Sequence, residues 1–593
     1  MIAAKKADFA KIAEEFNISP VAARLLRNRD LIEEEEIRRY LYGKLSDLHD
    51  PLLMKDMEKA AELLLFKIRQ KAAIRVIGDY DVDGICSAFI LWKGITALGG
   101  KADKVIPHRI KDGYGLNQEL ITAAKQEEID TIVTCDNGIA AAPQIDHAKE
   151  LGMTVIVTDH HEVPFEGEGE MRRYLLPQAD AVVDPKQPDC TYPFPHICGA
   201  VVAYKLVQTL VEKEQETSET EGKLLKGLLT ELLPFAALAT VCDVMELKGE
   251  NRILVKHGLA AMSQTENIGL KALLQVTGID KKPLTPYHAG FILGPCLNAT
   301  GRLDTATRAL QLFEAQDWRE AVTIAADLKS LNDSRKQMTE EGVKAAIQQV
   351  EETGLIQDKV LVIYLPECHE SLAGIIAGRI RERYGKPAFV LTMSEEGIKG
   401  SGRSIEAYSM YEEITACKDL FTKYGGHKMA AGLSLMRKEQ VTELRRRLNE
   451  SCKLTQEDFE ETVHIDVALP LACADRKLIQ ELSLLEPFGV GNPKPLFARK
   501  GISLLRGRKL GKNKNVGKYQ IADEKGAVYD MVYFGNLEEL DRFLAERFGQ
   551  ETAEQLYQGG LGVGSAPVSM AYYPDIDSYG GREKVQLIMQ YYC

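Results

Sequence analysis

The chain has 593 residues, of which 45% are hydrophobic and 27% are charged, and its formal net charge is −13. This composition is typical of a soluble globular protein, and the length exceeds what one core supports, so roughly three or four domains are expected. The acidic balance does not favour a protein wrapped wholesale in nucleic acid. No signal-peptide segment and no bilayer-spanning apolar run is evident, so we expect a cytoplasmic location without a membrane partner. The 11 cysteines are dispersed without a CxxC pair, which argues against a zinc ribbon and a disulfide framework.

Residues 1–70 predict mostly helices, one of which starts with Ser19 as its cap and Pro20 in its first turn. From residue 72 onward, β-branched runs alternate with helical patterns, of which 85–98 is the clearest helix. The predicted strands are residues 74–77, 104–106, 129–135, 154–158 and 181–183. Such alternation predicts an α/β fold with a parallel, doubly wound sheet.

Further along, the polar stretch 212–223 predicts an exposed loop, and 224–245 returns to an apolar helical pattern. Residues 305–352 predict long helices that join two domains, with Asp317 as an N-cap. A second α/β unit is predicted from strands at 359–364 and 387–391 and from glycine-rich segments at 400–404 and 424–432. Strand-like segments begin at 461–467, and the turn-rich segments at 495–593 predict a small β-barrel.

Acidic residues cluster where the predicted strands end. Asp79, Asp81 and Asp83 alternate directly after the first strand, where three carboxylates would raise one another's pKa unless a cation lies between them. A solvated turn is the alternative, and an EF-hand fits poorly because Ile90 occupies the position of the bidentate glutamate. We therefore expect these carboxylates to bind a divalent metal.

Three further groups extend this pattern. Asp136 follows the strand at 129–135, although Asp136-Asn-Gly138 alone is also typical of a turn. The run Asp159-His160-His161 follows the strand at 154–158, and Asp243 ends an apolar helical stretch. Since ligands bind at the carboxyl ends of parallel strands, these groups predict one two-metal site for phosphoryl hydrolysis. No Walker A pattern occurs, so ATP-driven work is not indicated.

Candidate phosphate contacts are weaker individually, since each has surface or turn duty as an alternative. They are Arg109, Arg302, Ser401 and Arg403. His369 and His427 are isolated and by default structural. Residues 499–518 hold eight Lys or Arg and no acid, which is typical of a groove that follows a phosphate backbone, with a solvated hairpin as the alternative.

These motifs together resemble a known family. Asp79-Tyr-Asp-Val-Asp-Gly84, Asp136-Asn-Gly138 and Asp159-His-His161 resemble the DHH phosphoesterase superfamily, and Tyr424-Gly-Gly-His427 with Ala430-Ala-Gly432 resembles its DHH-associated domain. Other stretches are similar to the RecJ-type single-stranded-DNA exonucleases of that superfamily. They are 48–51, 107–109, 113–116, 198–200, 294–302, 400–404 and 486–493, together with His369.

The resemblance implies a single-stranded-DNA-specific 5′-to-3′ exonuclease of DNA repair and recombination, which releases 5′-mononucleotides with two Mn²⁺ or Mg²⁺ ions. The implied metal ligands are Asp79, Asp81, Asp83, Asp136, His160 and Asp243. The implied catalytic residues are Asp81, Asp83, Asp136, His160 and His161. Asp159 is instead expected to orient its neighbours.

The resemblance also implies the substrate contacts and the partners. The substrate-binding residues would be Arg109, Arg302, His369, Ser401, Arg403, His427, Arg506, Arg508, Lys509 and Lys512. Single-stranded DNA is the expected partner, with a single-strand-binding protein and a helicase as further candidates. The sequence departs from the family at Cys296, Thr300 and Cys368, and Cys296 removes a positive charge beside Arg302.

The implied architecture has five parts. They are an N-terminal helical segment (1–70), a parallel-sheet DHH catalytic domain (71–304), connecting helices (305–355), a second α/β, DHH-associated domain (356–455) and a C-terminal OB-like β-barrel (456–593). Two alternatives stay open: a DHH enzyme that cleaves short RNA or cyclic dinucleotides, and an inactive DHH-derived replication scaffold. The first would usually lack the barrel, and the second would lack the metal carboxylates.

Overall fold

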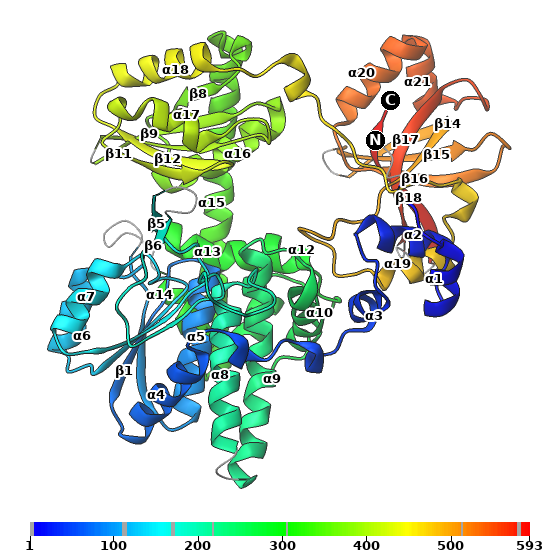
Figure 1. The fold of residues 1–593 in the computed structure, drawn as a ribbon. Coiled ribbons are helices and arrows are strands. Elements are labelled where there is room, and N and C mark those ends of the chain that lie inside the picture. Colours follow the sequence, from blue (N-terminus) through cyan, green and yellow to red (C-terminus); the bar gives the residue numbers. More distant parts are fainter. Residues whose placement is uncertain are drawn as a thin grey trace. The chain divides into compact units, whose positions relative to one another are not determined.

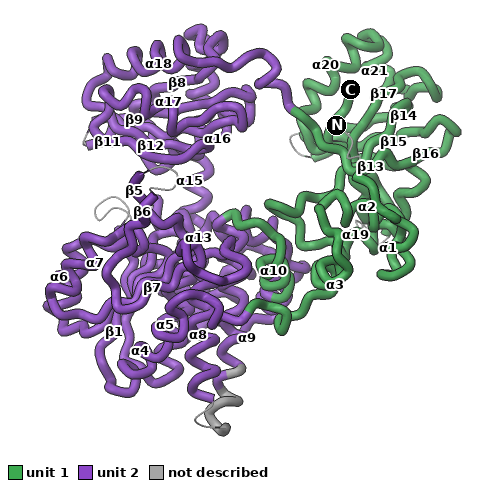
Figure 2. Tube along the Cα trace, in the orientation of Figure 1, with its two compact units in different colours: residues 1–49, 244–257, 462–593 green, residues 50–243, 258–461 purple. Residues whose placement is uncertain are grey.

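The structure is a computed structural model that describes residues 5–108, 115–167, 172–215, 219–303, 306–395, 397–511, 514–577 and 583–593. The chain divides into two compact units, which Figure 2 distinguishes by colour. Unit 1 comprises residues 1–49, 244–257 and 462–593, and unit 2 comprises residues 50–243 and 258–461. Within the described ranges, no helix has both the length and the hydropathy needed to cross a bilayer.

The first sheet of unit 2 has five parallel strands in the order β2-β1-β3-β4-β7. Figure 1 labels its strand β1. These strands are β1 (Ala73–Ile77), β2 (Lys101–Val105), β3 (Thr131–Cys135), β4 (Thr154–Thr158) and β7 (Ala181–Val183). All five overlap a predicted strand, although β2 begins three residues before the predicted 104–106, and the parallel pairing confirms the predicted sheet. The central strands are buried on both faces, as their continuous β-branched runs require. The strands β5 (Phe165–Glu166) and β6 (Arg173–Tyr174) pair with each other in a separate antiparallel sheet.

Helices cover both faces of this sheet. They are α4 (Met57–Arg69), α5 (Val82–Ala97), α6 (Gln118–Gln126), α7 (Ala142–Glu150), α8 (Gly199–Gln215) and α9 (Glu219–Cys242). Ile121 of α6 and Ile145 of α7 share one core with Ile132 of β3 and Val155 of β4. The α5, α8 and α9 helices contact one another, and α5 and α8 pack against the strands. The sheet is therefore the middle of three layers.

The predicted loop at 212–223 is wrong over its described residues. Residues 212–215 complete α8, and residues 219–223 form the first turns of α9. The stretch is rich in Glu, Lys and Gln, which are strong helix formers despite their polarity. A polar composition therefore did not indicate a loop at this place in the chain.

Helices dominate the chain between the two sheets. They are α10 (Gly249–Met262), α11 (Ile268–Val276), α12 (Pro286–His288), a π-helical turn (Ala289–Leu293), α13 (Gly294–Leu303), α14 (Thr307–Glu314) and α15 (Trp318–Glu352). The predicted N-cap is confirmed, since Asp317 accepts hydrogen bonds from the backbone N–H groups of Arg319 and Glu320 at the start of α15.

The second sheet of unit 2 is mixed, in the order β11-β12-β10-β9-β8. Its strands are β8 (Leu361–Tyr364), β9 (Ala388–Ser394), β10 (Gly397–Arg403), β11 (Lys423–His427) and β12 (Ala430–Leu435). Only β8 and β9 pair in parallel. The helices α16 (Ala373–Tyr384), α17 (Met410–Ala416) and α18 (Glu439–Ser451) complete the predicted second α/β part. Separate apolar cores lie on its two faces.

The C-terminal part of unit 1 is a closed five-stranded barrel, which confirms the predicted OB-like fold. Its strands are β14 (Phe497–Leu510), β15 (Val516–Ala522), β16 (Val528–Tyr533), β17 (Pro567–Asp577) and β18 (Lys584–Tyr592). β14 pairs with both β15 and β17, which closes the barrel. The strand expected at 461–467 is shorter than predicted: β13 spans only Val467–Ala468, and it pairs with β14. The helices α20 (Leu537–Phe548) and α21 (Gln550–Gln558) were not predicted.

The N-terminal helices belong to the same unit as the barrel. They are α1 (Phe9–Phe16), α2 (Pro20–Asn28) and α3 (Glu34–Tyr42), and α19 (Arg476–Ser483) lies with them. Leu25 and Leu26 of α2 share one apolar core with Tyr519 and Tyr572 of the barrel. Arg252 of α10 is buried in this unit and donates hydrogen bonds to the backbone carbonyls of residues 40 and 484–487.

Candidate metal centre

The loop after β1 places three carboxylates at the carboxyl edge of the parallel sheet. Asp79 is buried directly after the strand. Asp81 caps α5, because its Oδ1 accepts hydrogen bonds from the N–H groups of Asp83 (2.9 Å) and Gly84 (3.1 Å). Burial and the charge of Asp83 raise the pKa of Asp81. The fold therefore holds these carboxylates together against their mutual electrostatic repulsion, which a bound cation would remove.

Asp83 is fixed by the amino-terminal end of a second helix. Its two carboxylate oxygens accept hydrogen bonds from the N–H groups of Gly199 (2.7 Å) and Ala200 (2.8 Å), which begin α8. Unpaired backbone N–H groups at a helix start favour an anion there. A Cβ on Gly199 would lie 2.8 Å from the Cβ of Asp136 and 3.1 Å from Oδ2 of Asp83, so glycine is required for this approach.

Asp136 follows β3 in the left-handed backbone region, with a φ of 59°. Aspartate tolerates this conformation better than most residues, and the turn directs its buried carboxylate toward the same site. Burial raises the pKa of Asp136 well above its usual value, and the charges of Asp83 and Asp81 raise it further.

The imidazole of His160 lies at the middle of the cluster. Its Nε2 is 3.1 Å from Asp136 Oδ1, 3.5 Å from Asp83 Oδ2 and 3.7 Å from Asp243 Oδ2. Burial lowers the pKa of His160, which favours the neutral imidazole that a metal requires. Its Nδ1 is buried without a hydrogen-bond partner among the described residues.

His161 and Asp159 form a separate pair beside the cluster. His161 Nδ1 lies 2.7 Å from Asp159 Oδ1, and its side chain is 45% exposed. Burial alone would lower the pKa of His161, but the hydrogen bond and charge of Asp159 outweigh it and raise that pKa to about 9. Asp159 also accepts hydrogen bonds from the N–H groups of Ile139 and His160, so its oxygens serve this loop. This geometry agrees with the orienting role expected for Asp159.

Asp243 reaches the cluster from the carboxyl end of α9. Burial raises the pKa of Asp243 to about 8, with additional contributions from the charges of Asp83 and Asp81. Ligand atoms within 4.8 Å of one another define three overlapping sets: Asp136, His160 and His161; Asp83, His160 and Asp243; and Asp79, Asp81 and Asp136. Carboxylate oxygens with imidazole suit Mn²⁺, and oxygens alone suit Mg²⁺. The donor set therefore fits more than one divalent ion.

Adding Mn²⁺ is expected to raise the melting temperature, and the increase should grow between about pH 6 and about pH 9 because protons compete with metal for the ligands. The folded-state pKa of Asp243, about 8, lies above its unfolded value near 3.9. Without metal, stability is therefore lost as the pH rises from the lower value through the higher one. An ion that binds the ionised carboxylate offsets this loss, by about 2.7 kcal/mol at a hundredfold excess over its Kd. Differential scanning fluorimetry with and without Mn²⁺ measures the effect, and a shift independent of pH would contradict it.

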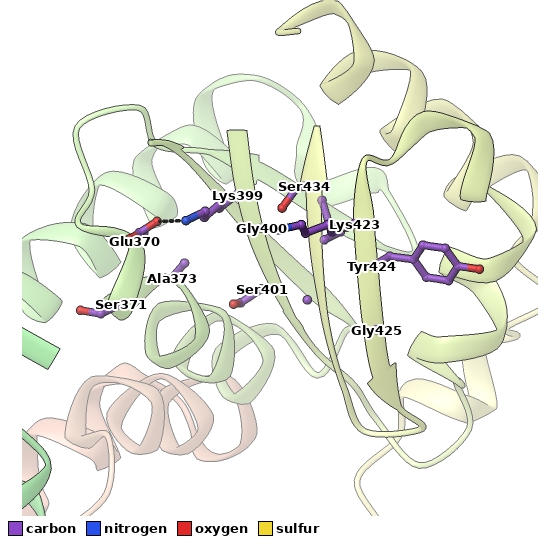
Figure 3. A pocket seen from close by; sticks show the side chains of 12 residues that line it. Glu370, Ser371, Ala373, Lys399, Gly400, Ser401, Lys423, Tyr424, Gly425 and Ser434 are labelled. Atoms are coloured by element: carbon purple, nitrogen blue, oxygen red, sulfur yellow. Dashed lines mark ion pairs between the residues drawn. The ribbon is translucent and has the colours of Figure 1, made fainter. Parts of the chain in front are cut away.

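Two of the candidate phosphate-binding residues, Ser401 and Arg403, lie in the second sheet of unit 2. Ser401 of β10 lines a cavity of about 490 Å³ together with Ser371, Lys399, Lys423 and Tyr424 (Figure 3). Figure 3 also shows the ion pair between Lys399 and Glu370, whose atoms lie 3.0 Å apart. The serine hydroxyls and Lys423 of this lining are groups that bind phosphate, whereas Lys399 is already paired with Glu370.

Arg302 of α13 points toward this domain, since its Nη1 donates to the backbone carbonyl of Ser371 at 2.7 Å. His369 contacts the Ser371 hydroxyl at 2.7 Å. Arg403 donates to the Gly402 carbonyl at 2.8 Å, and burial lowers its pKa. His427 is exposed. Arg403, His369 and His427 are not among the described residues that line the cavity, and Arg109 lies outside the described residues.

The basic run lies on the β14–β15 hairpin of the barrel. Arg506 and Arg508 are exposed and two residues apart on β14, so they share one face. Lys509 is paired with Asp541 of α20, so its charge is partly neutralised. Lys512 falls outside the described residues. The basic run is therefore part of a hairpin, and this hairpin also presents exposed basic side chains.

One acidic residue at the same sheet edge was missed. Asp184 follows β7 directly, is buried, and its Oδ2 has no hydrogen-bond partner in the described part of the chain. Burial raises the pKa of Asp184 to about 7, and the charge of Asp159 adds to this. An acid directly after a buried strand is the signal that identified Asp136 and Asp159. The same pattern therefore also identifies Asp184 as a residue of this sheet edge.

Comparison with known proteins matches three families along the chain. The DHH family N-terminal domain covers residues 73–234, the DHHA1 domain covers residues 357–454, and the RecJ OB domain covers residues 465–591. The chain is 37% identical to the single-stranded-DNA-specific exonuclease RecJ of Bacillus subtilis over 98% of this chain and 68% of that protein. It is 34% identical to RecJ of Escherichia coli over 81% of this chain and 83% of that one.

Solved structures give the same relationship. The crystal structure of RecJ from Thermus thermophilus in complex with Mn²⁺ has a TM-score of 0.78 and 27% identity, covering 100% of this chain and 79% of that chain. The Mg²⁺ complex of the same protein has a TM-score of 0.72 and 25% identity, covering 100% of this chain and 77% of that chain. With these matches in sequence, domain order and fold, the chain belongs to the RecJ family.

Proposed function

We propose that the chain is a single-stranded-DNA-specific exonuclease that hydrolyses phosphodiester bonds with two Mn²⁺ or Mg²⁺ ions. The observation that carries this proposal is the convergence of three overlapping ligand sets at one edge of the parallel sheet. The family relationship and the ions in the Thermus thermophilus structures support the choice of substrate and metal.

The proposed metal ligands are Asp79, Asp81, Asp83, Asp136, His160 and Asp243. Bound ions would supply a water of lowered pKa and stabilise the oxygens on which negative charge develops. The N–H groups of Gly199 and Ala200 keep the Asp83 carboxylate in place. Asp159 keeps His161 protonated and oriented, so that this partly exposed imidazolium can hold a phosphate oxygen or give up a proton from its outer nitrogen.

The second sheet and the barrel are proposed to bind the strand. Arg302, Ser401 and Arg403 would hold phosphate, and His369 and His427 would contact the strand nearby, as the resemblance implies. The exposed face of Arg506 and Arg508 would follow the backbone farther along. The five-part domain division, from the helical segment at 1–70 to the barrel at 456–593, is proposed with these roles.

Direction, product and context complete the proposal, and their support is the family resemblance. We propose digestion from 5′ to 3′ with release of 5′-mononucleotides, in DNA repair and recombination in the cytoplasm. A single-strand-binding protein and a helicase are the proposed protein partners. The OB barrel argues against an enzyme confined to short RNA or cyclic dinucleotides. The complete carboxylate set argues against an inactive scaffold.

Digestion of end-labelled DNA tests this function directly. Single-stranded DNA with a 5′ label should release labelled mononucleotide at once in Mn²⁺, whereas a 3′ label should stay on shortening fragments. Blunt duplex DNA and reactions with EDTA should show no release. Cleavage of a cyclic dinucleotide in preference to the strand, or equal digestion of duplex, would contradict the proposal.

A further inference from the structure

Two aromatic side chains of unit 2 lie exposed beside each other on the segment that precedes α13. Tyr287 of α12 is 62% exposed and Phe291 of the π-helical turn is 67% exposed. Their rings are stacked, with centroids 5.3 Å apart and planes inclined by 21°. Single exposed apolar residues are ordinary, but a stacked pair of this exposure is a small apolar surface with ring faces open to solvent.

The backbone holds this pair in place. The His288 Nδ1 atom accepts a hydrogen bond from the N–H of Thr285 at 3.1 Å, which fixes the turn around Tyr287. Residues 289–293 then adopt a π-helical turn, a conformation often found at functional sites. The two rings are therefore presented by an ordered segment.

This segment packs directly onto the chain that carries a metal-ligand candidate. The Cys242 thiol donates to the Ala289 carbonyl at 3.6 Å, and a Cβ on Gly294 would lie 2.5 Å from the Cys242 sulfur. Cys242 precedes Asp243, whose carboxylate lies 3.7 Å from His160. The segment that carries the aromatic pair thus packs against the residue directly before a metal-ligand candidate.

Two basic residues precede the pair closely in the chain. Lys281 and Lys282 are exposed just before α12, and neither is in an ion pair with a carboxylate of the described residues, although Asp280 precedes them. Aromatic faces beside basic side chains are the combination by which proteins bind single strands, since bases stack on the rings while phosphates meet the charges.

We propose that Tyr287 and Phe291 form a platform on which unpaired bases of the substrate stack next to the metal centre, and this rests on the proposed function. In a duplex both faces of each internal base are covered by its neighbours, so only a single strand offers faces to the rings. The platform therefore contributes to strand specificity as well as to affinity. Unpaired DNA bases occupy the platform, and the phosphates between these bases face Lys281 and Lys282.

The test compares the double variant Tyr287→Ala/Phe291→Ala with the unsubstituted protein and with Phe66→Ala. Phe66 is 54% exposed on α4, which leads into the amino end of β1 and therefore lies at the opposite edge of the sheet from the metal centre. Binding of a fluorescein-labelled, 5′-phosphorylated strand is measured by anisotropy in EDTA. We expect about tenfold weaker binding for the double variant, or about 1.4 kcal/mol, and no change for Phe66→Ala.

Abasic substitution identifies the stacked base. Strands with one abasic position, moved along the first nucleotides, should bind the original protein more weakly at one or two positions. The double variant should lose this dependence at the same positions. The inference is overturned if the variant keeps full affinity, if its abasic profile is unchanged, or if it loses only self-association in sedimentation. Failure of the proposed function is distinct, since the unsubstituted protein would then neither bind nor digest the strand.

Discussion

Replacing Asp136 by asparagine is expected to abolish Mn²⁺-dependent hydrolysis of single-stranded DNA while leaving strand binding within a few-fold. Asp136 belongs to two of the three ligand sets, so its substitution removes a carboxylate ligand from both of those sets. Metal ions supply several kcal/mol of charge stabilisation in such reactions, and each 1.36 kcal/mol is tenfold in rate, so kcat should fall by at least about 10³-fold. Single-turnover digestion of a 5′-labelled strand measures the change.

The matched control is Asp146→Asn, which removes an exposed carboxylate from α7 in the same part of the chain. This variant should digest the strand normally. Mn²⁺ titration calorimetry then separates a lost ion from a lost fold, with circular dichroism as the check on folding. Cleavage retained by Asp136→Asn at saturating Mn²⁺ would refute the metal assignment.

Replacing Arg506 and Arg508 by alanine should weaken binding to long strands and flatten its dependence on salt. Both guanidinium groups are exposed on one face of β14, and neither is in an ion pair with a carboxylate of the described residues. Each phosphate contact contributes about 0.7 to the slope of log affinity against log salt for single strands, so the slope should decrease by up to about 1.4. Around 0.1 M salt this corresponds to roughly ten- to thirtyfold in affinity. Anisotropy titrations over a salt series measure both quantities.

Arg542 and Arg547 provide the control, because they are exposed on α20 of the same unit and their removal changes net charge equally. Alanine at both positions should leave the slope unchanged. Hydrolysis of a short strand should survive the β14 substitutions, since the metal ligands are all in unit 2. If the salt dependence of binding is unaltered in Arg506→Ala/Arg508→Ala, the long strand does not bind along this face of β14. Lys509 should matter less than its neighbours because Asp541 already pairs with it.

The metal cluster could be predicted from the sequence because each acidic residue is recognisable from its position next to a strand. The parallel sheet then brings these positions close together in space. Asp79, Asp136 and Asp159 each follow a buried strand, and parallel strands bring their carboxyl ends to one edge. Asp243 was identified at the end of an apolar helix for a similar reason, since a buried acid requires a partner. Asp184 also follows a buried strand directly, so the same pattern predicts that it lies at this edge of the sheet.

Other features depend on contacts that no local pattern contains. The N–H groups of Gly199 and Ala200 hold Asp83 from more than a hundred residues away. The helical continuation through 212–215 and the helices α20 and α21 were missed because polar composition was taken for loops and short strands. Pairing of Arg302 with the Ser371 carbonyl likewise follows from packing between domains of unit 2.

The shared core of the first helices and the barrel has a consequence for synthesis on the ribosome. Leu25 and Leu26 emerge early, but the barrel residues that bury them, such as Tyr572, are made roughly 500 residues later, on the order of a minute at typical elongation rates. Throughout that interval the apolar faces of α1–α3 lack the barrel residues that complete their core. The catalytic part can complete its sheet and cores meanwhile, since its strands are close in sequence. The nascent chain therefore holds an active-site domain that is ready first, and an amino terminus that must be kept from aggregating until the last strand arrives.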